Sequence, residues 1–251
     1  MPLDKSDPYS YPLLYDEQYW WKKNDLDFWR DMLELSPGRR VLELGAGTGR
    51  VAKALLKQDI VYTGIDNSKI FIDYSKKQIK DDNAKFIIAD MADFNINKKF
   101  DLIFIPFNTF LHNLTDTDAR SCIESVQRHM TDDSLFIIDI LVPDPLFLYR
   151  PDNIRFPIME FHSSDKDTVV IVEETVQYNS KKNILDISWY YSTAEEKDFK
   201  KIKFKMRMFY NSEMIDMLNS LGISIKTIWG GYEREKYNEH SAQQIFCCQI
   251  T

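Results

Sequence analysis

The stretch Val41-Leu42-Glu43-Leu44-Gly45-Ala46-Gly47-Thr48-Gly49-Arg50 decides the fold of this chain. A run of apolar residues ends abruptly in three glycines at alternate positions, and helix-forming residues follow. This pattern is typical of a buried strand, a tight turn and the beginning of a helix. Glycines tolerate positive φ and let backbone approach a ligand closely because they carry no Cβ. The start of a helix offers free N–H groups and a positive dipole end to a polar group, so the segment predicts a nucleotide-like cofactor site.

Length and composition narrow the class of protein. The 251 residues fit one large domain, and 44% hydrophobic residues suffice for a sizeable core. The net charge of −7 disfavours a nucleic-acid interface, which needs a basic surface. The chain shows no apolar run of membrane-spanning length and no signal-peptide layout, and its three cysteines do not suggest disulfides. We therefore expect a cytoplasmic protein without nucleic-acid or membrane partners, and the spacing of His, Cys and carboxylates predicts no metal site.

Strands and helices alternate through the first part of the chain. Each expected strand is an apolar run rather than an alternating pattern, as expected for strands covered on both faces. The order predicts a parallel sheet with helices on both faces. The expected strands are 41–44, 60–65, 84–89, 101–106 and 135–141, and the expected helices are 50–57, 68–80 and 117–130, preceded by loosely helical spacing over 16–35.

The pattern changes after residue 142. Four prolines interrupt 143–158, and three runs rich in β-branched and aromatic residues follow, at 168–178, 183–193 and 200–210. They predict an antiparallel meander with one solvated face. The lysine-rich run 197–205 is likewise expected to be a strand with one solvated face. The chain then returns to a helix over 212–221, with Ser212 as N-cap and Gly222 as C-cap, and to two strands, 223–229 and 242–250.

The glycine spacing separates the cofactor classes. A dinucleotide site reads G-x-G-x-x-G, but here the glycines read G-x-G-x-G and Arg50 replaces the last glycine of that pattern. A bulky side chain there argues against a pyrophosphate-binding turn. A phosphate-binding loop of the G-K-S/T type is absent as well. An NAD-dependent oxidoreductase remains an alternative on these residues alone.

The segment 41–50 resembles motif I of the class I S-adenosylmethionine (SAM) dependent methyltransferases. The resemblance extends over about residues 15–251. The antiparallel insert makes the chain similar to small-molecule members of the family, such as glycine N-methyltransferases and amino-sugar N,N-dimethyltransferases. It implies an α/β fold, a Rossmann-like seven-stranded mostly parallel sheet with helices on both faces, and an antiparallel β insert after the fifth strand. The expected organisation is a single domain over 1–251 with an aromatic N-terminal arm or lid (1–35), a cofactor-binding core (36–142 and 211–251), and an insert that covers the substrate side or forms a dimer face (143–210).

The resemblance assigns the cofactor residues position by position. Glu43 would serve the methionine end of SAM, and the alternative is an exposed acid at a strand end. Asp66 follows the second strand, about 20 residues after the turn, where a carboxylate can accept both ribose hydroxyls, as it also does in NAD sites. After the third strand Asp90 would contact the adenine amino group, and Met91 would pack on the ring or else fill the core. The remaining expected contacts are Gly45, Ala46, Gly47 and Gly49 under the methionine, Asn67 beside the ribose or adenine, and Phe107 and Asn108 after the fourth strand.

These segments are far apart in the sequence but should meet in space. Ligands of open α/β sheets bind at the carboxyl ends of the strands, so all four loops converge on one crevice. His112 is the best candidate for a general base, because histidine titrates near neutral pH, and its alternative is a side chain that caps or packs at the next helix. Tyr15 is the preferred residue of the aromatic arm for contact with SAM or the acceptor and the second candidate for a catalytic role, with a plain core role as alternative. Tyr190, Tyr191, Trp189 and Arg207 are candidates for the substrate pocket.

The resemblance and the converging motifs lead to one hypothesis. The chain is expected to be a SAM-dependent methyltransferase that acts on a small molecule by in-line displacement, with nitrogen the favoured acceptor and oxygen next. The alternatives are the NAD-dependent oxidoreductase and a SAM-binding protein without catalysis. An exposed meander also allows a homodimer.

Overall fold

The computed structural model describes residues 10–250. They form two compact units: a core unit of residues 24–142 and 209–250, and an insert unit of residues 10–23 and 143–208. Residues 1–9 of the predicted arm lie outside the described residues. The chain passes from one unit to the other after Lys23, Val142 and Met208. The prediction of a single domain over 1–251 stays a prediction.

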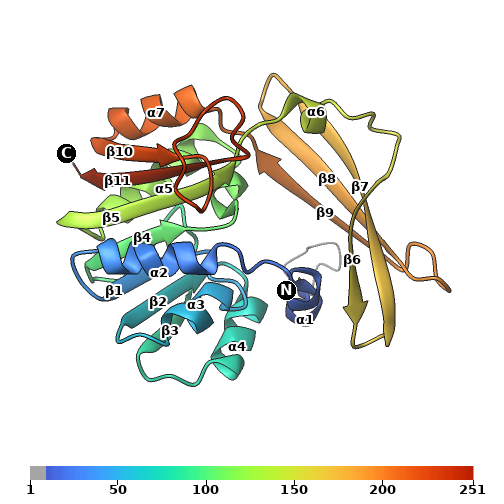
Figure 1. Ribbon diagram of the computed structural model, residues 1–251, viewed down its shortest axis with the longest axis horizontal. Helices are drawn as coiled ribbons and strands as arrows, with labels where there is room; N and C mark the ends of the chain where they lie inside the picture. Colours follow the sequence, from blue (N-terminus) through green and yellow to red (C-terminus); the bar gives the residue numbers. More distant parts are fainter. Residues whose placement is uncertain (1–9, 251) are drawn as a thin grey trace. The chain divides into compact units, whose positions relative to one another are not determined.

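The core unit is built on a seven-stranded sheet with the order β10-β11-β5-β4-β1-β2-β3 (Figure 1). β1 to β5 run parallel where they pair, and β11 is antiparallel to both β5 and β10. The predicted mostly parallel sheet is therefore confirmed. The strands are β1 Arg40–Leu44, β2 Val61–Asp66, β3 Ala84–Ile88, β4 Phe100–Ile105, β5 Met130–Leu141, β10 Ile223–Trp229 and β11 Gln243–Ile250.

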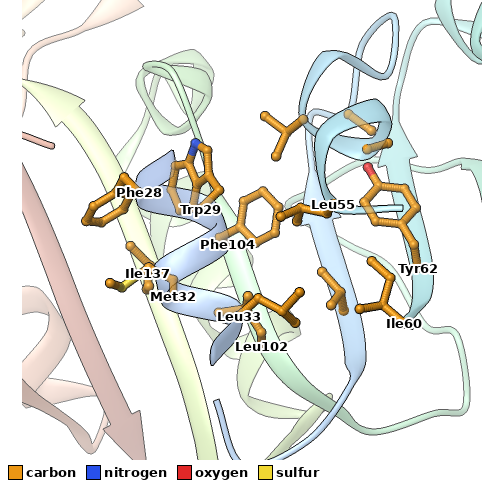
Figure 2. Packing of buried hydrophobic residues seen from close by; sticks show 14 of the residues in the cluster. Phe28, Trp29, Met32, Leu33, Leu55, Ile60, Tyr62, Leu102, Phe104 and Ile137 are labelled. Atoms are coloured by element: carbon orange, nitrogen blue, oxygen red, sulfur yellow. The ribbon is translucent and has the colours of Figure 1, made fainter. Parts of the chain in front are cut away.

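Helices cover both faces of this sheet. On one face Trp29 of α2 stacks on Phe104 of β4 with ring centroids 4.6 Å apart, inside the apolar cluster of Figure 2. The strand neighbours Ile103 and Ile105 are buried as completely as Phe104, so the opposite face is covered too. The helices are α2 Leu26–Leu35, α3 Arg50–Leu55, α4 Lys69–Gln78, the short 3₁₀ helix η2 Thr109–His112, α5 Asp116–Gln127 and α7 Asn211–Ser220.

Several boundaries differ from the expected ones. The helical spacing over 16–35 is split into α1 Pro12–Gln18 and α2, because the chain crosses between the units in the interval. Ser212 does not cap α7, which begins one residue earlier and has Tyr210 at the N-cap position without a side-chain bond. Gly222 follows that helix with φ +71°, as its predicted capping position requires.

His129 shows how a tertiary contact overrides a local pattern. The expected helix 117–130 includes this residue, but α5 ends before it and the ring is buried. Nε2 accepts a hydrogen bond from the Ile96 amide at 3.0 Å, Nδ1 lies 2.6 Å from the Ser125 carbonyl, and the ring stacks on Phe94. Burial lowers the pKa of His129 below its usual value. The side chain therefore belongs to the core as a neutral group.

The insert unit is a four-stranded antiparallel sheet with the order β6-β7-β8-β9 (Figure 1). It confirms the predicted insert after β5 but contains one strand more than expected, β6. Pro157 is tolerated there because β6 is an edge strand with a register shift at that residue. β9 alternates between buried and exposed residues, as predicted for the lysine-rich run. The elements are α1, α6 Pro145–Leu148, β6 Phe156–Ser163, β7 Thr168–Asn179, β8 Ile184–Ser192 and β9 Lys200–Arg207.

Candidate functional site

The core unit brings the predicted loops to one edge of the sheet. β4, β1, β2 and β3 are neighbours and run parallel, so the segments that follow them leave the sheet side by side. The glycine turn follows β1, Asp66 ends β2, Asp90 follows β3 and Phe107 follows β4. This edge is the candidate cofactor site.

Four backbone amides of the glycine turn are already hydrogen-bonded within the core unit. The N–H groups of Gly45 and Ala46 both donate to the Ile65 carbonyl, at 2.8 and 2.9 Å, and Gly49 donates to the Ala46 carbonyl. The Gly47 amide donates to Asp66 Oδ2 at 2.9 Å. The predicted free N–H groups are therefore not found at these four residues, whose amides fix the turn instead of facing a ligand.

The three glycines have different tasks, although all adopt positive φ. A Cβ on Gly45 would lie 2.2 Å from Thr109 Cγ2, and one on Gly49 would lie 2.5 Å from Ile79 Cδ1. A Cβ on Gly47 would meet nothing closer than Phe71 Cδ2 at 3.7 Å. Gly45 and Gly49 thus permit close packing of neighbouring elements, whereas a Cβ on Gly47 would lie at ordinary van der Waals distance from its neighbours. Gly47 is therefore not required by packing, and its missing side chain lets a ligand approach the backbone.

Asp66 is held in one orientation by two amides. In addition to the Gly47 bond, its Oδ1 accepts from the Ser68 amide at 2.8 Å. A carboxylate accepts hydroxyl donors through charge-assisted hydrogen bonds. Asn67, the next residue, is exposed. This arrangement suits the predicted contact with a ribose, which stays a prediction.

Asp90 and Met91 lie beyond β3. Asp90 is exposed, and its Oδ1 accepts from the Ala92 amide at 2.9 Å. Met91 is half-buried, with its sulfur 3.7 Å from Asn113 Nδ2. The alternative of Met91 as a fully buried core residue is therefore not what the structure shows. Their predicted adenine contacts stay predictions.

The segment after β4 is strained and firmly anchored. Phe107 and Asn108 adopt φ values of 50° and 64°, which non-glycine residues rarely do. Their amides donate to Oδ2 and the carbonyl of Asp139, at 2.9 and 3.0 Å, and Asn108 Oδ1 accepts from the Leu141 amide. Tyr232 donates to the same Oδ2 of Asp139 at 2.9 Å. Because backbone strain of this kind persists mainly at functional sites, the segment is a candidate for contact with the reacting groups.

Asp139 and Tyr232 were not predicted from the sequence. Asp139 is the only charged residue in the apolar run 135–141, and a lone acid inside a buried strand is a signal that could have been used. Its side chain is buried, and its partner Tyr232 lies 93 residues away. Burial raises the pKa of Tyr232 far above its usual value, so the phenol remains a donor to the carboxylate.

His112 is the last residue of η2 and is half-buried. It therefore lies on the same anchored segment as Phe107 and Asn108. The neighbouring helix α5 is capped by Thr115, whose hydroxyl accepts from the Asp118 amide, so the alternative of His112 as that cap is wrong. Its predicted function as a base stays a prediction.

Glu43 is a buried acid and not the exposed strand-end residue of the alternative interpretation. Its side chain accepts a hydrogen bond from the Tyr62 hydroxyl, which lies on the neighbouring strand beneath the turn. Burial raises the pKa of Glu43 to about 8, although Tyr62 and the positive charge of Arg50 oppose the shift. At neutral pH the neutral acid is therefore the main form in the free protein.

Glu43→Gln is expected to flatten the pH dependence of stability. The folded protein holds a proton on Glu43 up to about pH 8, whereas the unfolded chain releases it near the ordinary pKa of 4.5. Because the folded state binds more protons between these values, stability falls as pH rises through that window. The amide of Gln cannot ionise, so the melting temperature of the variant should fall less between pH 6 and pH 9 than that of the parent. Equal slopes in a calorimetric pH series would contradict the buried neutral acid.

Several predicted residues belong to the insert unit. Tyr15 lies in α1, where its ring packs on Tyr19 with centroids 4.7 Å apart, and its predicted contact stays a prediction. Tyr191 is buried and donates to Gln18 Oε1, and Trp189 donates to Glu174 Oε2. Arg207 is buried as well, while Tyr190 lies on the more exposed face. Their expected place in a substrate pocket stays a prediction too.

Within residues 10–250 no three His, Cys, Asp or Glu side chains gather as potential metal ligands. In the same range, no helix has the length and apolar character needed to cross a membrane.

Comparison with known proteins shows what the part of the chain with the candidate site is similar to. Residues 41–133 match a family model described as a methyltransferase domain. The Bacillus subtilis protein YqeM, itself assigned as a methyltransferase only provisionally, is 22% identical over 235 residues, which cover 89% of this chain and 90% of YqeM. Among solved structures, an S-adenosylmethionine-dependent methyltransferase from Clostridium acetobutylicum is similar with a TM-score of 0.77 and 17% identity, over 94% of this chain and 96% of that chain. A sugar N-methyltransferase from a Streptoalloteichus species gives a TM-score of 0.72 at 14% identity, over 92% and 91% of the two chains. At these identities the likeness to the solved structures is one of fold.

Proposed function

This chain belongs to the class I S-adenosylmethionine-dependent methyltransferases, and we propose that it transfers the methyl group to a nitrogen atom of a small molecule. Membership sets aside the NAD-dependent and non-catalytic alternatives. The residues present fit the cofactor, because Gly47, whose missing side chain exposes the backbone of the turn, is hydrogen-bonded to the carboxylate of Asp66. The nitrogen acceptor, the small substrate and the residue functions are the proposal.

The observation that carries the proposal is the anchored segment from Phe107 to His112. Asp139 holds its strained backbone in place, and Thr109 of the same segment packs against Gly45 of the cofactor turn. His112 ends the same 3₁₀ helix and is half-buried. Among the other histidines of the described core unit, His129 is buried and His240 is largely exposed, which supports His112 as the base.

Bound SAM supplies an electrophilic methyl group on a sulfonium, which leaves readily. The protein's main task is then to align the acceptor, and alignment alone can contribute ~7–11 kcal/mol. An amine arrives mainly as an ammonium ion at neutral pH and must lose a proton before it can attack. An imidazole nitrogen of His112 would accept that proton. A neutral alcohol holds its proton far more tightly, so a histidine base favours nitrogen over oxygen.

The remaining residues would hold the cofactor. Asp66 would accept the ribose hydroxyls through charge-assisted hydrogen bonds, and Met91 would pack on the adenine. The small substrate is supported by the fold likeness to the sugar N-methyltransferase, which includes the insert. The homodimer and the cytoplasmic location stay predictions.

Matched acceptors test the choice of nitrogen. The protein is incubated with SAM and pairs of small molecules that differ only by an amino group in place of a hydroxyl, such as an amino sugar and its parent sugar. Release of S-adenosylhomocysteine and the mass of the product are measured for each pair. Turnover with amines and not with their hydroxyl partners is expected. Turnover confined to hydroxyl compounds would overturn the nitrogen acceptor and leave the family unaffected.

A further inference from the structure

Arg50 and Asp25 form a bidentate ion pair at the cofactor edge of the core unit. Arg50 Nη1 and Nη2 donate to Asp25 Oδ1 and Oδ2 at 2.6 and 2.7 Å. The Asp25 side chain is fully buried and the Arg50 side chain is 23% exposed. Paired donors and acceptors of this kind fix direction as well as distance.

Asp25 ties the pair to the beginning of α2. It occupies the N-cap position of that helix, and its Oδ2 also accepts from Trp29 Nε1 at 3.1 Å. Trp29 is fully buried and stacks on Phe104 of β4, so α2 is fixed to the sheet directly below the pair. The carboxylate is therefore attached to the rigid interior of the unit.

Arg50 ties the same pair to the glycine turn and to the strained segment. It is the first residue of α3 and follows Gly49, whose φ is +80°. Its guanidinium carbon lies 5.8 Å from the centre of the Phe107 ring. One side chain thus contacts both the loop after β1 and the loop after β4.

The position of the pair relative to the strands indicates which end of the cofactor it affects. β1 lies between β4 and β2, and the pair extends from β1 towards Phe107 on the β4 side. Asp66 and Asp90, the proposed contacts of the adenosine, follow β2 and β3 on the other side. The pair therefore supports the methionine side of the site.

We propose that the Asp25–Arg50 pair positions the glycine turn and Phe107 so that they can bind the methionine end of SAM. A buried ion pair often adds little net stability, because desolvation offsets the attraction. Its effect should appear in cofactor affinity more than in folding. The inference depends on the SAM cofactor and not on the choice of acceptor.

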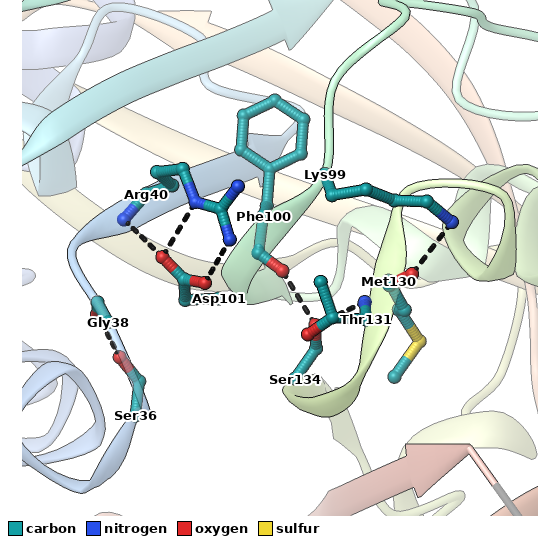
Figure 3. A network of polar contacts seen from close by, with 9 residues as sticks. All are labelled: Ser36, Gly38, Arg40, Lys99, Phe100, Asp101, Met130, Thr131 and Ser134. Atoms are coloured by element: carbon teal, nitrogen blue, oxygen red, sulfur yellow. Dashed lines mark hydrogen bonds and ion pairs between the residues drawn. The ribbon is translucent and has the colours of Figure 1, made fainter.

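The core unit contains a matched control. Arg40 Nε and Nη2 donate to Asp101 Oδ2 and Oδ1 at 3.0 and 2.6 Å, and the Arg40 amide donates to Oδ2 at 2.9 Å (Figure 3). This second pair joins the beginnings of the same two strands, β1 and β4, at the edge opposite the cofactor site. Substitutions there test the cost of losing an Arg–Asp pair without touching the turn.

The experiment compares Asp25→Asn and Arg50→Lys with Asp101→Asn and Arg40→Lys. Dissociation constants of S-adenosylhomocysteine and of 5′-methylthioadenosine, which lacks the amino-acid end, are measured by calorimetry at a temperature where circular dichroism shows each variant folded. We expect the first two variants to weaken S-adenosylhomocysteine binding by about tenfold, ~1.4 kcal/mol, with 5′-methylthioadenosine within about twofold of the parent. The control variants should bind both ligands like the parent.

Three outcomes would overturn the proposal. They are unchanged S-adenosylhomocysteine affinity in Arg50→Lys, equal loss for both ligands, and an equal loss in the control pair. Arg50→Lys keeps a positive charge beside the buried Asp25. Its affinity for S-adenosylhomocysteine therefore tests the proposal if Asp25→Asn does not fold. Failure of the parent itself to bind S-adenosylhomocysteine would instead contradict the cofactor assignment.

Discussion

Gly47→Arg is expected to abolish measurable SAM binding in a protein that still folds. A Cβ at this position meets no atom closer than 3.7 Å, an ordinary van der Waals distance, so the substitution does not force the core apart. The arginine would extend into the volume proposed for the cofactor and place a positive charge beside the sulfonium. We expect a loss of at least about a thousandfold in affinity, ~4 kcal/mol, measured by titration calorimetry.

Gly222→Arg is the matched control for that substitution. Gly222 has φ +71°, a Cβ added there would meet no atom within 4 Å, and the residue follows α7 away from the cofactor loops. Both variants therefore carry a similar penalty for a side chain in the left-handed region, of about 1–2 kcal/mol. If Gly47→Arg bound SAM as tightly as Gly222→Arg, Gly47 would not lie at the cofactor site.

His112→Gln is expected to lower kcat for an amine acceptor by about 10²–10⁴-fold, with SAM affinity within about twofold of the parent. Gln keeps the polarity and approximate size of the side chain but cannot take up a proton. The parent rate should rise with pH as the base loses its proton, and the variant should lack that rise. Steady-state rates over a pH series with the acceptor found in the matched-pair experiment provide the measurement.

Two comparisons make the His112 result specific. His240→Gln, at a side chain that is 87% exposed, should leave kcat and its pH dependence unchanged. A kcat for His112→Gln within threefold of the parent, or a parallel loss of SAM affinity, would show that His112 supports the fold of η2 and does not act as a base. A parallel loss is the result expected of a structural residue, because η2 packs against the glycine turn.

Local chemistry made part of the site predictable. The apolar run before Gly45, the alternation of strands and helices, and the acid at Asp66 each depend on residues close together in sequence. Periodicity and glycine conformation act at that range, so the mostly parallel sheet and the order of its loops followed from the chain alone. The antiparallel insert was predicted for the same reason, except β6, an edge strand that contains Pro157 and follows a proline-rich segment.

The tertiary structure decided which polar groups are buried and which residues they contact. Burial made Glu43 a neutral core acid beside Tyr62, and His129 became a core residue through its bond with Ile96. Asp25 meets Arg50 from 25 residues away, and Asp139 meets Tyr232 from 93. The sequence by itself determined the scaffold and the position of the cofactor turn, because short-range sterics and hydrophobic periodicity act within one element. The anchoring of that turn and of the segment after β4 depended on hydrogen bonds that exist only once distant strands have paired.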